Sequence, residues 1–112
     1  MKNFETAISF DDVLLVPRHS NIETRAEIDL SSTIGDRDFE IPIVSSPMDT
    51  VTGPAMATAM NKAGGLGIIH RYCTTDEQAK MVRKITTGMK AAAIGVTGDY
   101  HDRAKALVAM GT

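Results

Sequence analysis

The stretch Ile41-Pro-Ile-Val-Ser-Ser-Pro-Met-Asp-Thr-Val-Thr52 decides the fold. It begins with Ile41, Ile43 and Val44, a pattern that predicts a strand buried on both faces, and it continues with small polar residues around Pro47. A buried strand therefore becomes a loop. In parallel α/β folds, ligands bind just beyond the carboxyl ends of the strands, so we expect a substrate at this loop. Its candidate residues are Ser45, Ser46, Met48, Asp49 and Thr50.

Two more strands follow at a regular interval. Leu66-Gly-Ile-Ile-His70 predicts a second buried strand and Ala91-Ala-Ala-Ile-Gly-Val96 a third, so the strands start near residues 41, 66 and 91, at intervals of 25. Strand-helix units that repeat without a long crossover make all the strands parallel. The spacing leaves two folds open, the eightfold β/α barrel and the open doubly wound sheet. No Gly-x-Gly-x-x-Gly follows the first strand, which favours the barrel.

Three helices are expected between and after these strands. Gly53-Pro54 opens the first and Gly64-Gly65 ends it. Its apolar residues recur at helical spacing, which predicts a narrow face against the sheet. That face consists of Met56, Ala59, Met60 and Ala63.

The second and third helices have start and stop signals of their own. Thr74-x-x-Glu77 is a capping box, and Gly88 is expected to mark the end of the second helix. Asp99 is expected to cap the third helix, and Gly111 to stop it. The residues expected on their buried faces are Met81, Val82 and Ile85 in the second helix, and Ala104, Leu107 and Val108 in the third.

The part of the chain before residue 41 predicts an arm and a hairpin. Residues 1–20 read as an extended arm that Pro17 stops, and Asp11-Asp12 within it either caps a surface turn or, as the alternative, binds a ligand. From Ala26 onward the apolar residues alternate with period two. Gly35-Asp36 then supplies a tight turn, so we expect a hairpin leading into the central strand.

Composition bounds the class of protein. The chain has 112 residues, of which 43% are hydrophobic, enough for one modest core. A net charge of -2 and a pI near 5.8 argue against nucleic-acid and membrane partners. The first residues, Met-Lys-Asn-Phe-Glu, lack the apolar run of a signal peptide. The single Cys73 fits a reducing compartment and argues against a metal site, so a cytoplasmic location is expected.

The length also indicates an incomplete barrel, because a full barrel needs about 250 residues. We expect residues 1–40 to form the arm and hairpin and residues 41–112 the first three β/α units. Open sheet edges and apolar helix faces would remain uncovered. Further chain or a complementary barrel fragment is expected to cover them.

Three motifs carry a resemblance to a known family. They are Phe10-Asp-Asp-Val-Leu-Leu-Val-Pro17, the stretch 41–52, and Gly64-Gly-Leu-Gly-Ile-Ile-His-Arg71. In this order and at these separations, the chain resembles the N-terminal part of the IMP dehydrogenase and GMP reductase family. The Ser-Ser-Pro-Met-Asp-Thr loop is more similar to the dehydrogenases. Residues 83–90 run straight into the third strand, so the chain resembles a form without the inserted CBS modules.

The resemblance implies a (β/α)8 barrel enzyme of guanine nucleotide biosynthesis, an IMP dehydrogenase that oxidises IMP to XMP with NAD. It also implies a homo-tetramer and a thioimidate intermediate on a catalytic cysteine, with an arginine as base. Both groups, and a monovalent cation such as K⁺, are expected on later parts of the family's barrel, so no catalytic residue is expected here. The alternatives are a GMP reductase that converts GMP to IMP with NADPH, a catalytically incomplete half-barrel that binds or assembles, and an unrelated α/β nucleotide binder.

The resemblance also implies binding residues. Ser46 and Met48 match positions that touch the purine nucleotide; the alternative for Ser46 is a hydroxyl bond to the backbone before Pro47. Asp49 is a further candidate, although with Thr50 it could instead fix the loop. The remaining candidates are His70 and Arg71 for substrate, with a structural role as the alternative, and Thr24 and Arg25 for the adenosine end of the cofactor across a subunit interface. Cys73 does not match the nucleophile and is expected to be an ordinary thiol.

Overall fold

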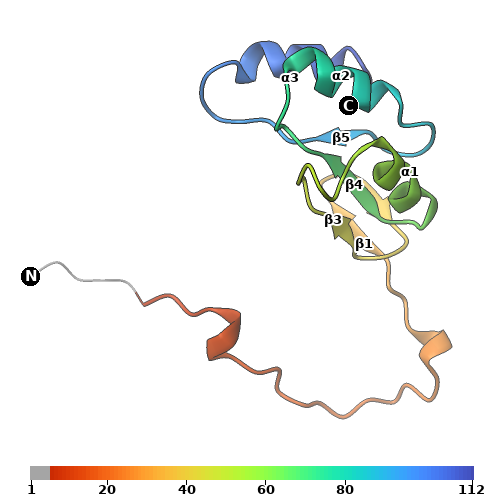
Figure 1. Ribbon diagram of the computed structural model, residues 1–112. Helices are drawn as coiled ribbons and strands as arrows, with labels where there is room; N and C mark the ends of the chain where they lie inside the picture. Colours follow the sequence, from red (N-terminus) through yellow and green to blue (C-terminus); the bar gives the residue numbers. More distant parts are fainter. Residues whose placement is uncertain (1–5) are drawn as a thin grey trace, which may run out of the picture.

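The computed structural model describes residues 6–112 and contains an N-terminal arm, a small hairpin and three β/α units (Figure 1). Residues 1–5, on which the expectation about a signal peptide depended, lie outside the described part. The elements in chain order are two 3-10 helices, η1 (Phe10–Asp12) and η2 (Arg25–Glu27), then β1 (Ser32–Ile34), β2 (Arg37–Phe39), β3 (Val44–Ser45), α1 (Pro54–Lys62), β4 (Leu66–Ile69), α2 (Thr75–Arg83), β5 (Ala91–Ala92) and α3 (Tyr100–Val108).

The three strands of the β/α units form one parallel sheet in the order β3-β4-β5. Ser45 pairs with Gly67 across the first ladder and Ile69 with Ala92 across the second. The predicted parallel arrangement and strand order are confirmed. Because each strand lies beside the next in the same direction, all three carboxyl ends meet at one edge.

The strands are shorter and more open than expected. The prediction of a strand buried on both faces at Ile41 to Val44 is wrong: β3 has only two residues, and the side chains of Ile43 and Val44 are 55% and 44% exposed. Likewise only Ala91–Ala92 of the expected strand 91–96 is paired. The short pairing follows from position, since β3 and β5 are both edge strands in the part of the chain that the structure describes, and each pairs on one side only. The exposure of Ile43 and Val44 means that no element within residues 6–112 covers these side chains.

The core lies between the sheet and helices from all three units. Its members are Ala57 of α1, Ile69 of β4, Val82 of α2, Ile85 two residues after α2, and Leu107 of α3. Since the three helices share one cluster with β4, they cover the same face of the sheet, which is the arrangement of a barrel. The buried face predicted for the second helix is confirmed.

The face predicted for α1 is wrong, because the helix turns a different side to the sheet. Ala57 is buried and Met60 half-buried, whereas Met56, Ala59 and Ala63 are exposed. Gly67 explains the choice: a Cβ built at Gly67 would lie 2.4 Å from the Ala57 Cα, so the helix backbone rests directly on this glycine. The missing side chain in β4, rather than the apolar stripe of α1, orients the helix.

Helix boundaries follow most of the expected signals. Gly53-Pro54 begins α1, and the capping box at Thr74 is formed, with Glu77 Oε2 accepting from both the Thr74 amide and its hydroxyl. Helix α2 ends at Arg83, before Gly88, because Ile85 already turns into the core. The Asp99 side chain makes no cap bond; it binds α3 in another way described below.

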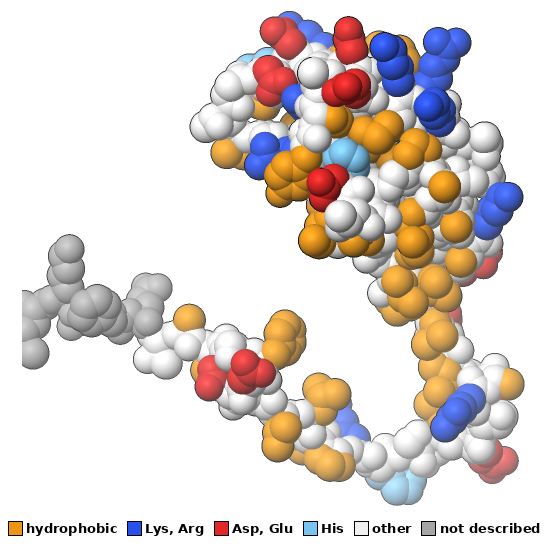
Figure 2. Space-filling model, in the orientation of Figure 1, with side chains coloured by type: hydrophobic (Ala, Val, Ile, Leu, Met, Phe, Trp, Pro, Cys, Tyr) orange, Lys and Arg blue, Asp and Glu red, His pale blue; other side chains and the backbone are white. Residues whose placement is uncertain are grey.

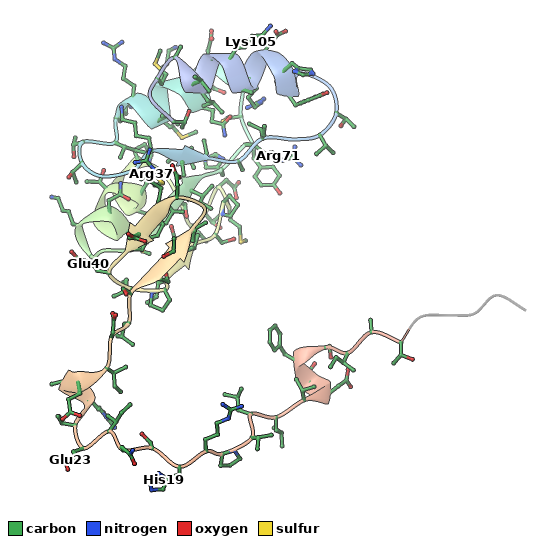
Figure 3. All side chains as sticks on the ribbon, turned by 180° about the vertical axis from the view of Figure 1, so that it is seen from behind. His19, Glu23, Arg37, Glu40, Arg71 and Lys105 are labelled. Atoms are coloured by element: carbon green, nitrogen blue, oxygen red, sulfur yellow. The ribbon has the colours of Figure 1, made fainter. Side chains whose placement is uncertain are left out.

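The hairpin is confirmed, and it is short. Strands β1 and β2 pair antiparallel around Gly35, whose φ of 65° suits a tight turn, and Thr33 Oγ1 donates to Asp38 Oδ1 at 2.8 Å. Residues 26–31 do not join the strand, because residues 25–27 form η2 instead. In Figure 3, Arg37 of the hairpin and Arg71 are labelled at separate places in the β/α part of the chain.

The N-terminal arm lies apart from the β/α units. Residues 6–31 are all exposed, and the radius of gyration of 18.4 Å exceeds the roughly 13 Å of a compact chain of this length. Hydrophobic side chains line the arm without cover (Figure 2), among them Phe10, Leu14 and Leu15. Asp12 Oδ2 accepts from the Ser9 amide at 2.8 Å, which is the turn-forming role expected of the Asp11-Asp12 pair and lowers the pKa of Asp12. Among residues 6–112, no helix has the length and apolar character needed to cross a membrane.

Candidate functional site

The candidate site is the edge where β3, β4 and β5 end. Side-chain alternation assigns the faces of the sheet. Gly67 and Ile69 face the helices, so His70 lies on the other side, which we call the inner face. Ser45 pairs with Gly67, and Ser46 therefore follows onto the inner face as well. The sheet thus places Ser46 and His70, each one residue beyond a strand, on the same face of neighbouring strands.

The loop after β3 is held by Thr52, a residue that the sequence did not single out. Thr52 is fully buried, and its hydroxyl donates to the Ser46 carbonyl and lies 2.9 Å from the Ser45 hydroxyl. Two backbone amides, those of Val51 and Thr52, donate to the Met48 carbonyl at 3.0 and 2.9 Å. The loop is therefore closed on itself before α1 starts.

These bonds leave the side chains of Ser46 and Met48 free. The Met48 amide donates to the Ser46 carbonyl at 2.8 Å, so the contacts of Ser46 within the loop run through its backbone. In residues 6–112 the Ser46 hydroxyl has no hydrogen-bond partner, and the alternative in which it bonds the backbone before Pro47 is not seen. Met48 is 49% exposed. Asp49 Oδ1 accepts from the Thr50 amide at 2.9 Å, which is the loop-fixing bond considered for it.

The end of β4 carries a buried histidine and an exposed arginine. His70 is 9% exposed, and its Nδ1 has no hydrogen-bond partner within the described residues. Its ring stacks on that of Tyr72, with 6.4 Å between the two ring centres, and the Arg71 guanidinium carbon lies 5.8 Å from the centre of the Tyr72 ring. A Cβ built at Gly95 would lie 3.6 Å from Arg71 Nη1, so Arg71 reaches the segment after β5 (Figure 3).

A buried polar pair supports this edge from behind. Gln78 Nε2 donates to the carbonyls of His70 and Ala93, at 2.9 and 2.8 Å, and Gln78 Oε1 accepts from Arg103 Nη1 at 2.9 Å. Arg103 also donates to the Cys73 carbonyl at 3.1 Å and to Asp99 Oδ2 at 2.8 Å. Helices α2 and α3 are thereby joined to the segments that follow β4 and β5.

Two groups beside this pair have shifted pKa values. Hydrogen bonds from Arg103 and then from Thr75, whose hydroxyl is 3.0 Å away, lower the pKa of Asp99. Asp99 is the N-cap residue of α3 as predicted, but its side chain pairs with Arg103 rather than with a helix amide. Burial raises the pKa of the Cys73 thiol, so Cys73 lacks the thiolate character of a nucleophile.

Gln78 and Arg103 could have been found from their spacing. Gln78 precedes Val82 by four residues, and Arg103 precedes Leu107 by four, so each lies within the buried stripe of its helix. A polar residue inside an apolar stripe must find a partner when it is buried. Because Gln78 and Arg103 lie on successive helices, each is a candidate partner for the other.

The cofactor candidates lie elsewhere. The Thr24 hydroxyl accepts from the Ala26 amide at 3.4 Å and caps η2, and Arg25 is the first residue of that helix. Both residues are exposed on the arm, and Figure 3 shows the neighbouring Glu23 far from Arg71. The structure does not bring Thr24 and Arg25 to the strand ends of their own chain. Across residues 6–112, His, Cys, Asp and Glu form no group of three or more that could hold a metal ion.

Comparison with known families gives a match over almost the whole chain. The family model described as the IMP dehydrogenase / GMP reductase domain matches residues 7–112. This match includes the arm, the hairpin and all three β/α units.

Two curated relatives carry the same kind of name. The inosine-5'-monophosphate dehydrogenase of Nitrosopumilus maritimus (strain SCM1) is 49% identical over 83 residues, and that of Korarchaeum cryptofilum (strain OPF8) is 48% identical over 82 residues. Each alignment covers 73% of this chain and 17% of the relative. The chain therefore corresponds to about a sixth of these proteins.

A solved structure of the same family also matches the chain. The crystal structure of inosine 5' monophosphate dehydrogenase from Legionella pneumophila matches with a TM-score of 0.80 and 36% sequence identity. The match covers 96% of this chain and 33% of that chain. It confirms the predicted fold, the N-terminal part of a (β/α)8 barrel.

Proposed function

Because the chain belongs to the IMP dehydrogenase / GMP reductase family, we propose that it forms the nucleotide-binding edge of an IMP dehydrogenase, which oxidises IMP to XMP with NAD in guanine nucleotide biosynthesis. The observation that carries the choice of the dehydrogenase is the 48–49% identity to two proteins of that name. The loop Ser-Ser-Pro-Met-Asp-Thr at residues 45–50, free of internal side-chain bonds at Ser46 and Met48, supports a site there.

The side chains at this edge suit a purine mononucleotide. A half-exposed thioether at Met48 can pack on a flat base, and the free Ser46 hydroxyl can donate or accept a hydrogen bond. The unpartnered Nδ1 of His70 lies on the same inner face. A buried nitrogen without a partner is costly, and a bound ligand would relieve that cost. Arg71, exposed at the same edge, supplies a positive charge for a phosphate group.

The oxidation itself depends on groups beyond these residues. NAD supplies the hydride acceptor when it is bound. This chain corresponds to 17% of its curated relatives, and its Cys73 has a raised pKa, so we assign residues 6–112 to binding and place the nucleophile, the base and the monovalent-cation site in the rest of the enzyme. Asp49 contributes by fixing the loop.

We also propose an oligomer, with the homo-tetramer as its form. The arm is exposed throughout and carries Phe10, Leu14 and Leu15 without cover, a surface that a neighbouring subunit can bury. Thr24 and Arg25 lie on this arm away from their own strand ends, so a contact with the adenosine end of NAD would reach the site of a neighbouring subunit. A cytoplasmic location is proposed from the nucleotide substrate and the free Cys73 thiol.

The test is an assay of the full-length gene product that contains these residues. Purified protein is incubated with IMP and NAD, or with GMP and NADPH, and the reduced nicotinamide is followed by its absorbance. We expect NADH to form with the first pair and no NADPH to be consumed with the second. Ser46→Ala and Met48→Ala are expected to raise the KM for IMP about tenfold, because each removes a direct contact.

Each outcome separates the candidate functions. Consumption of NADPH with GMP would identify the reductase instead. Binding of IMP by calorimetry without turnover of either pair would identify a binding or assembly module. Lys105→Ala serves as the control variant, since this lysine is exposed on the outer side of α3, and its KM should equal that of the parent.

A further inference from the structure

Gln78 occupies an unusual place for a polar side chain. It is 0% exposed, although it belongs to a helix that faces solvent on its other side. Both protons of its amide group are used, one on the His70 carbonyl and one on the Ala93 carbonyl. These carbonyls belong to the residues that directly follow β4 and β5, so the side chain joins the two strand ends.

The two Gln78 bonds lie just beyond the last backbone bond between β4 and β5. The last backbone bond between the strands runs from the Ala93 amide to the Ile69 carbonyl at 2.9 Å. The His70 and Ala93 carbonyls are the next acceptors toward the carboxyl edge. Gln78 therefore continues the β4–β5 ladder by one more step with a side chain, at the level where the strands separate.

The segments beyond this step carry the binding candidates. His70 lies there with its Nδ1 buried and without a partner among residues 6–112, and Arg71 crosses toward Gly95 of the neighbouring segment. Arg103 in turn holds Gln78 through Nη1 and the Cys73 carbonyl through Nη2. The Arg103 guanidinium thus binds both the side-chain amide of Gln78 and the backbone at Cys73, three residues beyond His70.

We propose that Gln78, held by Arg103, is a positioning residue for nucleotide binding: it fixes the segment 70–73 against the segment 93–95, so that His70 and Arg71 are in place before the nucleotide arrives. It touches no ligand itself. The kinetic part of this inference rests on the proposed function, whereas the order of the two segments does not. Preorganisation of this kind appears in binding and rate when it is lost.

The chain contains a matched control in Asn61. Its Nδ2 donates to two backbone carbonyls, those of Thr87 at 2.6 Å and Met89 at 2.8 Å. These lie before β5, at the amino edge of the sheet. Asn61→Leu therefore removes the same two kinds of bond as a Gln78 substitution, from the edge where no nucleotide is expected.

The experiment uses the full-length gene product and three variants, Gln78→Met, Gln78→Glu and Asn61→Leu. The KM for IMP and kcat are measured, together with hydrogen-deuterium exchange of peptides covering residues 70–74, 86–90 and 93–98. For Gln78→Met we expect a KM raised about 10- to 100-fold and faster exchange at 70–74 and 93–98. For Asn61→Leu we expect faster exchange at 86–90 and a KM within about twofold of the parent.

Gln78→Glu is a second substitution at the same position, which keeps the inference testable if Gln78→Met does not fold. A carboxylate still accepts from Arg103, but it cannot donate to the two carbonyls, so both changes expected for Gln78→Met should recur. The inference is overturned if both Gln78 variants keep the parent KM, or if their exchange at 70–74 and 93–98 is unchanged. A parent that turns over no IMP refutes the proposed function instead, and the exchange data then decide alone whether Gln78 orders the edge.

Discussion

Gly67→Ala is expected to destabilise the fold through one defined contact. The added Cβ would lie 2.4 Å from the Ala57 Cα and 2.9 Å from the Ala57 Cβ, both atoms of a helix that cannot yield as a flexible side chain would. Ordinary contact begins at 3.4 Å, so α1 would have to move away from β4 by about 1 Å. Overpacking on this scale costs about 1 to 3 kcal/mol.

Gly95→Ala is the control for this substitution. Its Cβ would meet the nearest atom at 3.6 Å, an ordinary contact, and neither glycine has the positive φ that would strain an alanine. Replacing a glycine in such a conformation stabilises a protein by about 0.4 to 1 kcal/mol, because the unfolded chain loses freedom. The two variants should therefore change stability in opposite directions.

The measurement is urea unfolding of the full-length gene product, followed by circular dichroism, with the free energies of the two variants compared with the parent. A second readout is the KM for IMP, since α1 begins directly after the loop that Thr52 closes and its displacement moves that loop. If Gly67→Ala and Gly95→Ala agree within about 0.5 kcal/mol, the close approach of α1 to β4 is not as described.

Three further predictions concern single side chains. Thr52→Val should cost about 1 to 2 kcal/mol in urea unfolding and raise the KM for IMP, because the Ser46 carbonyl loses a buried donor; an unchanged KM would show that the loop does not depend on it. The pKa of Asp99 is lowered, mainly by Arg103, so its contribution to stability is complete above its ordinary value of 3.8 and is lost as the pH falls through the lower value of the folded state. Asp99→Asn should therefore lower the unfolding midpoint at neutral pH, and the difference from the parent should shrink as the pH falls below 3.8; a difference that stays constant into acid contradicts this. Since burial raises the pKa of Cys73, iodoacetamide at neutral pH should label it more slowly than a free peptide thiol, and fast labelling would refute that assignment.

Local patterns in the sequence predicted the parts of the fold that depend on neighbours along the chain. The capping box at Thr74, the turn at Gly35 and the start of α1 at Pro54 each follow from a few consecutive residues, and each is present. The parallel order of the strands also followed, because repeated β/α units leave few other ways to connect them.

Local sequence patterns did not predict the side-chain contacts described next. Periodicity assigned the buried face of α1 to Met56 and Ala59, but the glycine at position 67 of another element turned Ala57 inward. Asp99 is the N-cap residue of its helix as expected, but its side chain accepts from Arg103 and from Thr75 of α2 instead of from a helix amide. Short-range propensity carries no information on which face of a neighbour lacks a side chain.

The residues of the candidate site also fall into two groups, those that local sequence patterns could locate and those that they could not. The loop at residues 45–50 and the strand end at His70 could be located, because strand ends in a parallel sheet meet at one edge. The residues that hold this edge, Gln78 and Arg103, lie on helices remote in sequence from the loop. Their roles required knowledge of which carbonyls lay within reach.

The exposed arm has a practical consequence for any mutational survey of this chain. Residues 6–31 contribute little burial to the β/α units, so substitutions there leave the free energy of unfolding almost untouched. A change of Phe10 or Leu15 that nevertheless alters behaviour must act through a contact that residues 6–112 do not make among themselves, either with the rest of the barrel or with another subunit. The arm is thus a region where a loss of activity reports contacts made outside the three β/α units, separate from the damage to packing that complicates every position in the core.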